Sequence, residues 1–228
     1  MYVLGKSIYT ITPFTLLDYP HKSACILWYV GCNMRCLYCY NPEIVLGKGT
    51  TSFAETISFL KTRQGLLDAV VFSGGECLIH KNIIQHIKEI KAMGFLVKID
   101  TNGSNPAVLK QLINENLIDY VALDFKATKE KFQEITKSDL FQPFEKSFEI
   151  LLENTIQFEI RTTYHSDLIS NSELNEMVGY LDAKKYTGNY YVQSFKNNVA
   201  TLGDLNSSVR IKENEFSSAS HFKVIFRN

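Results

Sequence analysis

Three cysteines, Cys32, Cys36 and Cys39, lie within eight residues on a polar loop. A chain with five cysteines, three of them this close together, is poorly suited to a disulfide framework. Three thiolates can bind three irons of a four-iron cluster, which normally takes four cysteine ligands. Because no fourth cysteine lies at a nearby spacing, the fourth iron would stay open to a substrate. The spacing therefore predicts one [4Fe-4S] cluster with an open iron.

Zinc is the main alternative at these cysteines. Structural zinc usually has four protein ligands with paired two-residue spacings. Here the first gap holds three residues, and no Cys or His pair follows at zinc-finger spacing. A zinc-stabilised binding module remains the alternative from a different functional class. The other two cysteines, Cys25 and Cys77, are interpreted as small buried residues.

A second polar segment, Ser73, Gly74, Gly75 and Glu76, follows the next apolar run of the chain. Two glycines at a strand end let the backbone approach a ligand closely. The carboxylate beside them can bind a cationic amine. A plain Gly-Gly turn is the alternative interpretation of the same residues.

Two later apolar runs also carry polar side chains. One ends in Asp100, Thr101 and Asn102, and the next holds Asp124 and Lys126. Residues two apart on a strand share a face. Because a lone buried charge is costly, Asp124 and Lys126 must pair with each other or bind a ligand. An ion pair that only stabilises the fold is the alternative.

Short apolar runs alternate with amphipathic stretches along the chain. The runs are rich in β-branched and aromatic residues and predict strands over 24–30, 69–73, 96–101, 120–126, 158–164 and 190–195. The stretches between them predict helices over 53–63, 81–93, 107–116, 144–154 and 173–185. This alternation indicates βα units and a parallel sheet.

The predicted fold class is α/β, an incomplete (β/α)6 barrel whose curved parallel sheet has helices outside. A complete eight-unit barrel takes about 250 residues, whereas this chain has 228. We expect residues 9–20 to form a small extension over the sheet and residues 221–226 to add an edge strand. Arg161 and Gln193, on the fifth and sixth runs, either project into the cavity or lie at its rim.

Size and charge narrow the classes of partner. A 228-residue chain with 45% hydrophobic content suits one domain over 1–228, with a core at about 20–195 and a C-terminal extension over 196–228. Lys+Arg 24 balances Asp+Glu 24, which argues against a nucleic-acid partner. No apolar run approaches a membrane span, and the first residues do not resemble a secretory signal. We therefore expect a cytoplasmic location and no membrane partner.

The cysteine spacing, with Tyr38 before the last cysteine and a Gly-Gly-Glu segment one βα unit later, resembles the signature of the radical S-adenosylmethionine (SAM) superfamily. The resemblance implies that the three cysteines hold the cluster and that SAM chelates the open iron. It also implies that Glu76 binds the amino group of SAM and that Lys126 contacts its carboxylate. The SAM-binding candidates are Tyr38, Ser73, Gly74, Gly75, Glu76, Asp100, Thr101, Asn102, Asp124 and Lys126.

Segments 14–20, 41–43, 100–103, 124–127 and 193–195 resemble the activating proteins of anaerobic ribonucleoside-triphosphate reductase. This resemblance implies that a reduced flavodoxin- or ferredoxin-type donor drives cleavage of SAM to methionine and a 5′-deoxyadenosyl radical. That radical would take a hydrogen atom from a glycine of the reductase. The departures from the family pattern remove no ligand; they are His21, Leu37, Tyr40 and Cys77.

Two other radical SAM functions stay open. One is an enzyme that acts on a small molecule, similar to 7-carboxy-7-deazaguanine synthase, which would share every SAM residue. The other is an activase of another glycyl radical enzyme, such as a formate-lyase. Those activases often carry a two-cluster insert after the first strand, which this sequence lacks.

Overall fold

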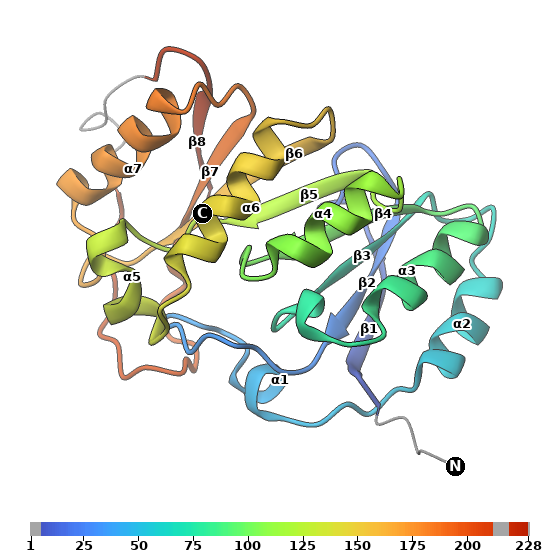
Figure 1. Ribbon diagram of the computed structural model, residues 1–228. Helices are drawn as coiled ribbons and strands as arrows, with labels where there is room; N and C mark the ends of the chain where they lie inside the picture. The colour runs from blue at the N-terminus through green and yellow to red at the C-terminus, as the bar shows by residue number, and fades with distance from the viewer. Residues whose placement is uncertain (1–5, 212–218, 228) are drawn as a thin grey trace. The chain divides into compact units, whose positions relative to one another are not determined.

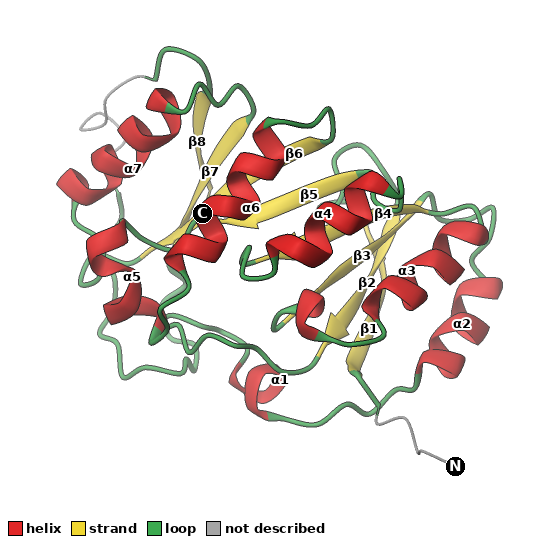
Figure 2. Cartoon of the chain, in the orientation of Figure 1, coloured by secondary structure: helices red, strands yellow, loops and turns green. Residues whose placement is uncertain are grey.

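The computed structural model describes residues 6–211 and 219–227. It has the predicted α/β fold, whose strands follow one another across the sheet in chain order, as Figure 1 and Figure 2 show. Met1–Gly5, residues 212–218 and Asn228 lie outside the described residues, so part of the predicted C-terminal extension is not included. Within the described part, the chain forms two compact units.

The first unit comprises the described residues up to 33, residues 41–101 and residues 105–121. Its strands are β1 (Ile8–Thr15), β2 (Ala24–Tyr29), β3 (Ala69–Gly74) and β4 (Leu96–Thr101). Its helices are α1 (Pro42–Leu46), α2 (Phe53–Lys61), α3 (Ile83–Ala92) and α4 (Pro106–Asn114), with a short 3-10 helix at Cys77–Ile79.

The second unit comprises residues 34–40, residues 102–104 and the described residues from 122 onward. Strand β5 (Tyr120–Asp124) crosses the division between the units. The other strands of the second unit are β6 (Gln157–Tyr164), β7 (Asn189–Ser194) and β8 (Lys223–Arg227). Its helices are α5 (Lys129–Thr136), α6 (Phe141–Leu152) and α7 (Asn171–Ala183).

All six predicted strands and all five predicted helices are present. The helix predicted over 144–154 begins three residues earlier, at Phe141. Two helices were missed, α1 and α5. Helix α1 has only five residues, and α5 is mostly polar, with Phe132, Ile135 and Thr136 as its buried residues. Neither helix has the long apolar stripe on which the prediction of helices from sequence depends.

The two ends of the sheet differ from each other. The expectation that residues 9–20 lie over the sheet was wrong for their first half, since β1 pairs with β2 as an antiparallel edge strand. An edge strand is stabilised by backbone hydrogen bonds, which leave little trace in the apolar pattern. The indole Nε1 of Trp28 also donates to Thr12 Oγ1 at 2.9 Å. The strand expected over 221–226 is confirmed as β8, which pairs in parallel with β7.

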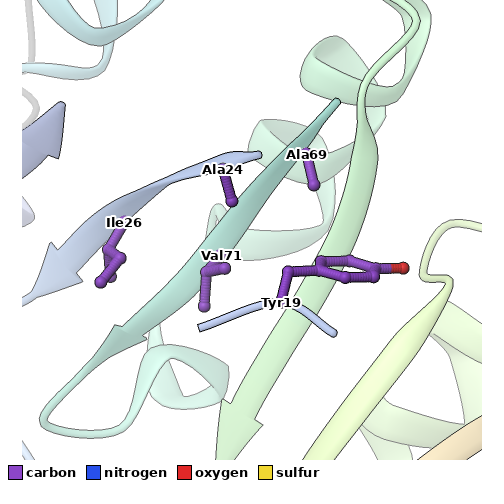
Figure 3. Close-up of a cluster of buried hydrophobic side chains, with 5 residues drawn as sticks. All are labelled: Tyr19, Ala24, Ile26, Ala69 and Val71. Carbon is purple, nitrogen blue, oxygen red and sulfur yellow. The ribbon is translucent and has the colours of Figure 1, made fainter. Parts of the chain in front are cut away.

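Parallel register gives one face of β2, β3 and β4 a gradient from apolar to polar. Ala24 pairs with Ala69 at the amino ends of the strands, and Ile26 pairs with Val71 further along. Figure 3 shows these four side chains and Tyr19 as one buried cluster. Residues on this face toward the carboxyl ends are Trp28, Ser73, Lys98 and Asp100. The apolar end therefore closes the core, and the polar end is left for chemistry.

The opposite face of these strands packs against helices α2 and α3. Leu27, Phe72 and Ile99 on that face are fully buried. The hydroxyl of Tyr29 lies 3.0 Å from His86 Nδ1 of α3, and the ring of Phe53 from α2 stacks on His86 with 3.7 Å between ring centroids. None of the described helices is long and apolar enough to cross a lipid bilayer.

Candidate functional site

The cysteine loop follows β2. The amide of Gly31 donates to Ile44 O at 2.9 Å, which holds the start of the loop on α1. Cys36 is buried, Cys32 and Cys39 are half-buried, and all five cysteines are free thiols. Free thiols on one irregular loop suit metal or cluster binding better than structural packing. The observed loop therefore fits a cluster held by Cys32, Cys36 and Cys39.

In the second unit, backbone hydrogen bonds hold the middle of the loop. The amide of Arg35 donates to Thr136 O at 2.8 Å, and the amide of Leu37 donates to Ile135 O at 3.0 Å. The amide of Cys39 donates to Cys36 O at 3.0 Å, which forms a tight turn between these two cysteines. The end of α5, an element that the sequence did not predict, thus supports the segment that carries Cys36 and Cys39.

The two glycines allow β3 to pack directly against the start of the cysteine loop. Gly74 has φ +116°, and a Cβ there would overlap the backbone of Tyr29. A Cβ on Gly75 would overlap the carbonyl oxygen of Gly31 and approach the Cβ of Cys32 to 3.3 Å. The amide of Glu76 donates to Gly31 O at 2.9 Å. The two glycines therefore allow a close approach, as the sequence predicted, but in the structure the approach is between the end of β3 and the start of the cysteine loop.

Glu76 is buried, with 1% of its surface exposed. Its Oε1 accepts hydrogen bonds from Thr101 Oγ1 at 2.8 Å and from the Leu78 amide at 3.1 Å. Thr101 is itself buried at the end of β4. These bonds hold the Glu76 carboxylate in one orientation at the carboxyl end of β3, as a binding site for an ammonium group requires.

Asp100 is held by two side chains of the first unit. The Nζ of Lys98 lies 2.9 Å from Asp100 Oδ1, and Ser73 Oγ donates to Asp100 Oδ2 at 3.0 Å. Lys98 was missed at the sequence level, although a lysine in the middle of an apolar strand, two residues from an aspartate, is a recognisable signal. Its side chain is only 2% exposed. Asp100 is therefore positioned by the protein itself.

Asp124 lies between two cations in the second unit. Lys126 Nζ is 2.9 Å from Asp124 Oδ2, and Arg161 Nε is 3.0 Å from Oδ1. The sequence left open whether Asp124 and Lys126 pair with each other or bind a ligand, and in the structure they form an ion pair. Arg161, left undecided by the sequence, joins this pair. Burial lowers the pKa of Lys126. Asp124, Tyr38 and Cys36 together raise this pKa by more than burial lowers it, so the pKa of Lys126 lies well above its usual value. Together the three side chains carry one net positive charge.

Tyr38 is buried beside this group, with Lys126 Nζ 5.9 Å from its ring centroid. Burial raises the pKa of Tyr38 well above its usual value, although Lys126 opposes the shift, so the phenol is neutral. Its hydroxyl has no hydrogen-bond partner among the described residues. A buried unsatisfied hydroxyl is costly and is typical of a site that receives a ligand.

The remaining candidates have structural roles in the described chain. Asn102 is buried and accepts a hydrogen bond from the Ser104 amide at 2.9 Å, which shapes the turn after β4. Cys25 and Cys77 are buried, as predicted. Burial raises the pKa of Cys25 to about 12 and that of Cys77 well above its usual value, so both remain thiols.

No three His, Cys, Asp or Glu side chains within residues 6–211 and 219–227 lie close enough to share a single metal ion. A four-iron cluster makes a different demand, because each cysteine binds a different iron. The assignment of the three loop cysteines as cluster ligands therefore depends on their spacing, on their being free thiols and on the family to which the chain belongs.

A model of the radical SAM superfamily matches residues 26–178. The chain belongs to this superfamily, whose members use a [4Fe-4S] cluster and SAM, so the predicted cofactors are confirmed. It is 31% identical over 215 residues to a Methanocaldococcus jannaschii protein named "Putative glycyl-radical enzyme activating enzyme". That match covers 90% of this chain and 86% of the relative.

Two further relatives match about half of the chain. The pyruvate formate-lyase-activating enzyme of Clostridium pasteurianum is 31% identical over 132 residues, which is 54% of this chain and 53% of that enzyme. The 7-carboxy-7-deazaguanine synthase of Aquifex aeolicus is 25% identical over 143 residues, which is 54% of this chain and 64% of that enzyme.

Solved structures with the same fold are larger proteins. Streptococcus suis SuiB has a TM-score of 0.62 at 13% identity, over 79% of this chain and 41% of SuiB. The enzyme anSMEcpe with bound AdoMet has a TM-score of 0.63 at 21% identity, over 78% of this chain and 52% of that enzyme. These similarities confirm the predicted fold class, an α/β fold with a curved parallel sheet that does not close.

Proposed function

We propose that the chain is a glycyl-radical-enzyme activase built on one radical SAM domain over 1–228. The observation that carries this proposal is the similarity to the Methanocaldococcus jannaschii protein, which extends over 90% of this chain and 86% of the relative. The formate-lyase-activating relative supports the same class over about half of the chain. As the partner we propose anaerobic ribonucleoside-triphosphate reductase, with a flavodoxin- or ferredoxin-type protein as electron donor.

The proposed ligands of the cluster are Cys32, Cys36 and Cys39. When bound, the cluster supplies one electron that cleaves SAM to methionine and a 5′-deoxyadenosyl radical, which takes a hydrogen atom from the glycine Cα to give 5′-deoxyadenosine and a glycyl radical. The polar loop and its backbone contacts would keep the three thiolates in place during this reaction. Gly74 and Gly75 would hold the neighbouring strand end against the loop.

Glu76 is the proposed partner of the SAM amino group. Its oxygen Oε1 is already oriented by Thr101 and Leu78, so the carboxylate would not have to reorganise when the ammonium binds. Asp100 and Ser73 support the same strand ends from β4 and β3. Asn102 would act indirectly, through the shape of its turn.

The group of Asp124, Lys126 and Arg161 is the proposed site for the SAM carboxylate. Its net positive charge complements an anion, and the raised pKa of Lys126 keeps that lysine charged at neutral pH. Tyr38 closes the same site, and its unsatisfied hydroxyl is available to a ligand group. Charged partners for both ends of the methionine moiety are thus assigned to this chain's own residues.

Electron paramagnetic resonance tests the proposed partner. The cluster-loaded protein would be mixed anaerobically with SAM, a reductant and the reductase of the same organism. A glycyl radical doublet that disappears when the target glycine of the reductase is changed to alanine is the expected result. Formation of 5′-deoxyadenosine without any radical on the reductase would refute this partner.

The similarity to 7-carboxy-7-deazaguanine synthase favours a second candidate, a radical SAM enzyme that acts on a small molecule. The two functions differ in what gives up the hydrogen atom. Production of 7-carboxy-7-deazaguanine in the absence of any protein partner would favour this candidate and exclude the activase.

A further inference from the structure

Residues 195–206 form a strap that follows β7 in the second unit and runs along the cysteine loop (Figure 1). The amide of Gly203 donates to Leu37 O at 2.8 Å, and the amide of Leu202 donates to Cys39 O at 3.2 Å. Both acceptors are backbone carbonyl oxygens of the loop. The strap therefore restrains the backbone at Cys39, one of the proposed cluster ligands.

The turn from Cys36 to Cys39 is thus restrained from two sides. The amide of Leu37 donates to Ile135 O at the end of α5 at 3.0 Å, whereas Leu37 O accepts from the strap. Cys36 is buried and Cys39 is half-buried. Backbone groups that are bonded to two different elements hold the separation of the two cysteines, because any change in it would break some of these bonds.

Tyr40 adds a side-chain contact to the strap. Its Oη accepts a hydrogen bond from the Lys196 amide at 2.7 Å, and its ring stacks on that of Phe195 with 5.4 Å between centroids. Tyr40 directly follows Cys39 and, like Leu37, lies at a position where the sequence departs from the family pattern. The family signature therefore does not encode this contact, which belongs to this chain.

The backbone of Gly203 lies too close to the loop for a side chain. A Cβ there would lie 2.9 Å from Leu37 O and 3.0 Å from Leu37 Cβ. An alanine would therefore push the strap away from the loop and lengthen the hydrogen bond to Leu37. By contrast, a Cβ on Gly179 of α7 would meet no atom within 4 Å, which makes that glycine a matched control.

The strap is itself anchored to the end of β6. The Asp167 amide donates to Nδ1 of the buried His165 at 3.1 Å, so Nε2 carries the ring proton and donates to Asn206 O at 2.9 Å. At the other end, the Phe195 amide donates to Tyr164 O at 2.9 Å, and the Phe195 ring meets His165 edge-on. Because both ends are fixed, the middle of the strap can hold the cysteine loop in place.

We propose that Tyr40 and Gly203 are positioning residues for the iron–sulfur cluster. They hold the strap against the loop, and the strap keeps the turn from Cys36 to Cys39 in the arrangement that ligation requires. The inference rests on the proposed cluster ligands and is independent of the identity of the substrate. When the strap is released, the two thiolates gain freedom and the cluster loses iron more readily. Its electronic properties change as well, because solvent exposure and hydrogen bonding around the ligands influence them.

Anaerobic iron release measures this role. The cluster-loaded protein is mixed with bathophenanthroline disulfonate, which is coloured when it binds ferrous iron, well below the melting temperature. Tyr40→Phe keeps the stacked ring but removes the acceptor, and Gly203→Ala displaces the strap. Each should speed iron release at least about fivefold, which corresponds to about 1 kcal/mol, the net contribution of one hydrogen bond. The double variant should be faster than wild type by less than the product of the single effects, because both changes release the same strap.

Two variants elsewhere in the second unit serve as controls. Gly179→Ala adds the same methyl group on α7, and Tyr180→Phe removes a hydroxyl that donates to Glu145 Oε1 at 3.1 Å. Both should release iron at the wild-type rate. Electron paramagnetic resonance of the dithionite-reduced cluster separates positioning from general stability. Its g values should shift in Gly203→Ala and not in Gly179→Ala, while the cluster-free forms melt within about 4 °C of cluster-free wild type.

Iron release at the wild-type rate in both Tyr40→Phe and Gly203→Ala would overturn the inference. Equal acceleration in the two control variants would also overturn it. If Gly203→Ala fails to fold, the comparison of Tyr40→Phe with Tyr180→Phe decides. A wild-type protein that takes up no iron would overturn the proposed ligands themselves, whereas a stable cluster that is indifferent to changes in the strap would overturn this inference alone.

Discussion

Breaking the ion pair between Lys98 and Asp100 should destabilise the fold more than breaking a more exposed lysine–aspartate pair does. The two side chains are 2% and 11% exposed, and Nζ lies 2.9 Å from Oδ1. Replacing Lys98 with methionine leaves the Asp100 carboxylate buried without this partner. Breaking a buried pair in this way costs about 3–5 kcal/mol. For a chain of this size, 1 kcal/mol corresponds to roughly 2–4 °C in melting temperature, so the expected loss is about 6–20 °C.

Circular dichroism on the cluster-loaded protein, at one scan rate, measures this loss. The matched control is Lys91→Met, which breaks a lysine–aspartate pair of the same 2.9 Å length whose side chains are 23% and 28% exposed. Such a pair contributes about 0–1 kcal/mol. Adding Asp100→Asn to Lys98→Met removes the carboxylate charge that has lost its lysine and should recover most of the melting temperature. Equal losses in Lys98→Met and Lys91→Met, or no recovery in the double variant, would refute this assignment.

Three further predictions concern the site and its support. Cys36→Ala should lose iron and abolish 5′-deoxyadenosine formation, because a cluster ligand is removed; full activity would contradict the ligand assignment. Thr101→Val removes the hydroxyl that donates to Glu76 Oε1 and should raise the KM for SAM about tenfold, whereas an unchanged KM would contradict a role of Glu76 in SAM binding. Burial, followed by the effect of His80, lowers the pKa of His86 to about 4. Because the unfolded chain then binds more protons between about pH 6.5 and 4, stability should fall by about 3 kcal/mol as the pH falls through that window. His86→Gln should flatten the dependence of melting temperature on pH, and an unchanged slope would contradict the shift.

Sequence-based prediction succeeded where the information lies in short segments. The spacing of Cys32, Cys36 and Cys39 indicates how a cluster would be bound, because all three cysteines lie on one short loop. Their spacing can therefore be interpreted without knowledge of the fold. The buried parallel strands were recognisable because their apolar runs are continuous. Strand β1 and helix α5 were missed, since backbone pairing and a short polar helix leave weak local patterns.

Tertiary structure alone decided which residues act together. Register brings Lys98 and Asp100 beside Ser73, and it sets Gln193 between Thr163 and Arg227. The hydrogen bonds between residues 195–203 and the cysteine loop join segments more than 150 positions apart. No local pattern encodes such contacts, because they exist only after the strands have paired. The sequence by itself thus determined the cofactor chemistry of this protein, while its folded form decided which side chains and backbone groups support the site.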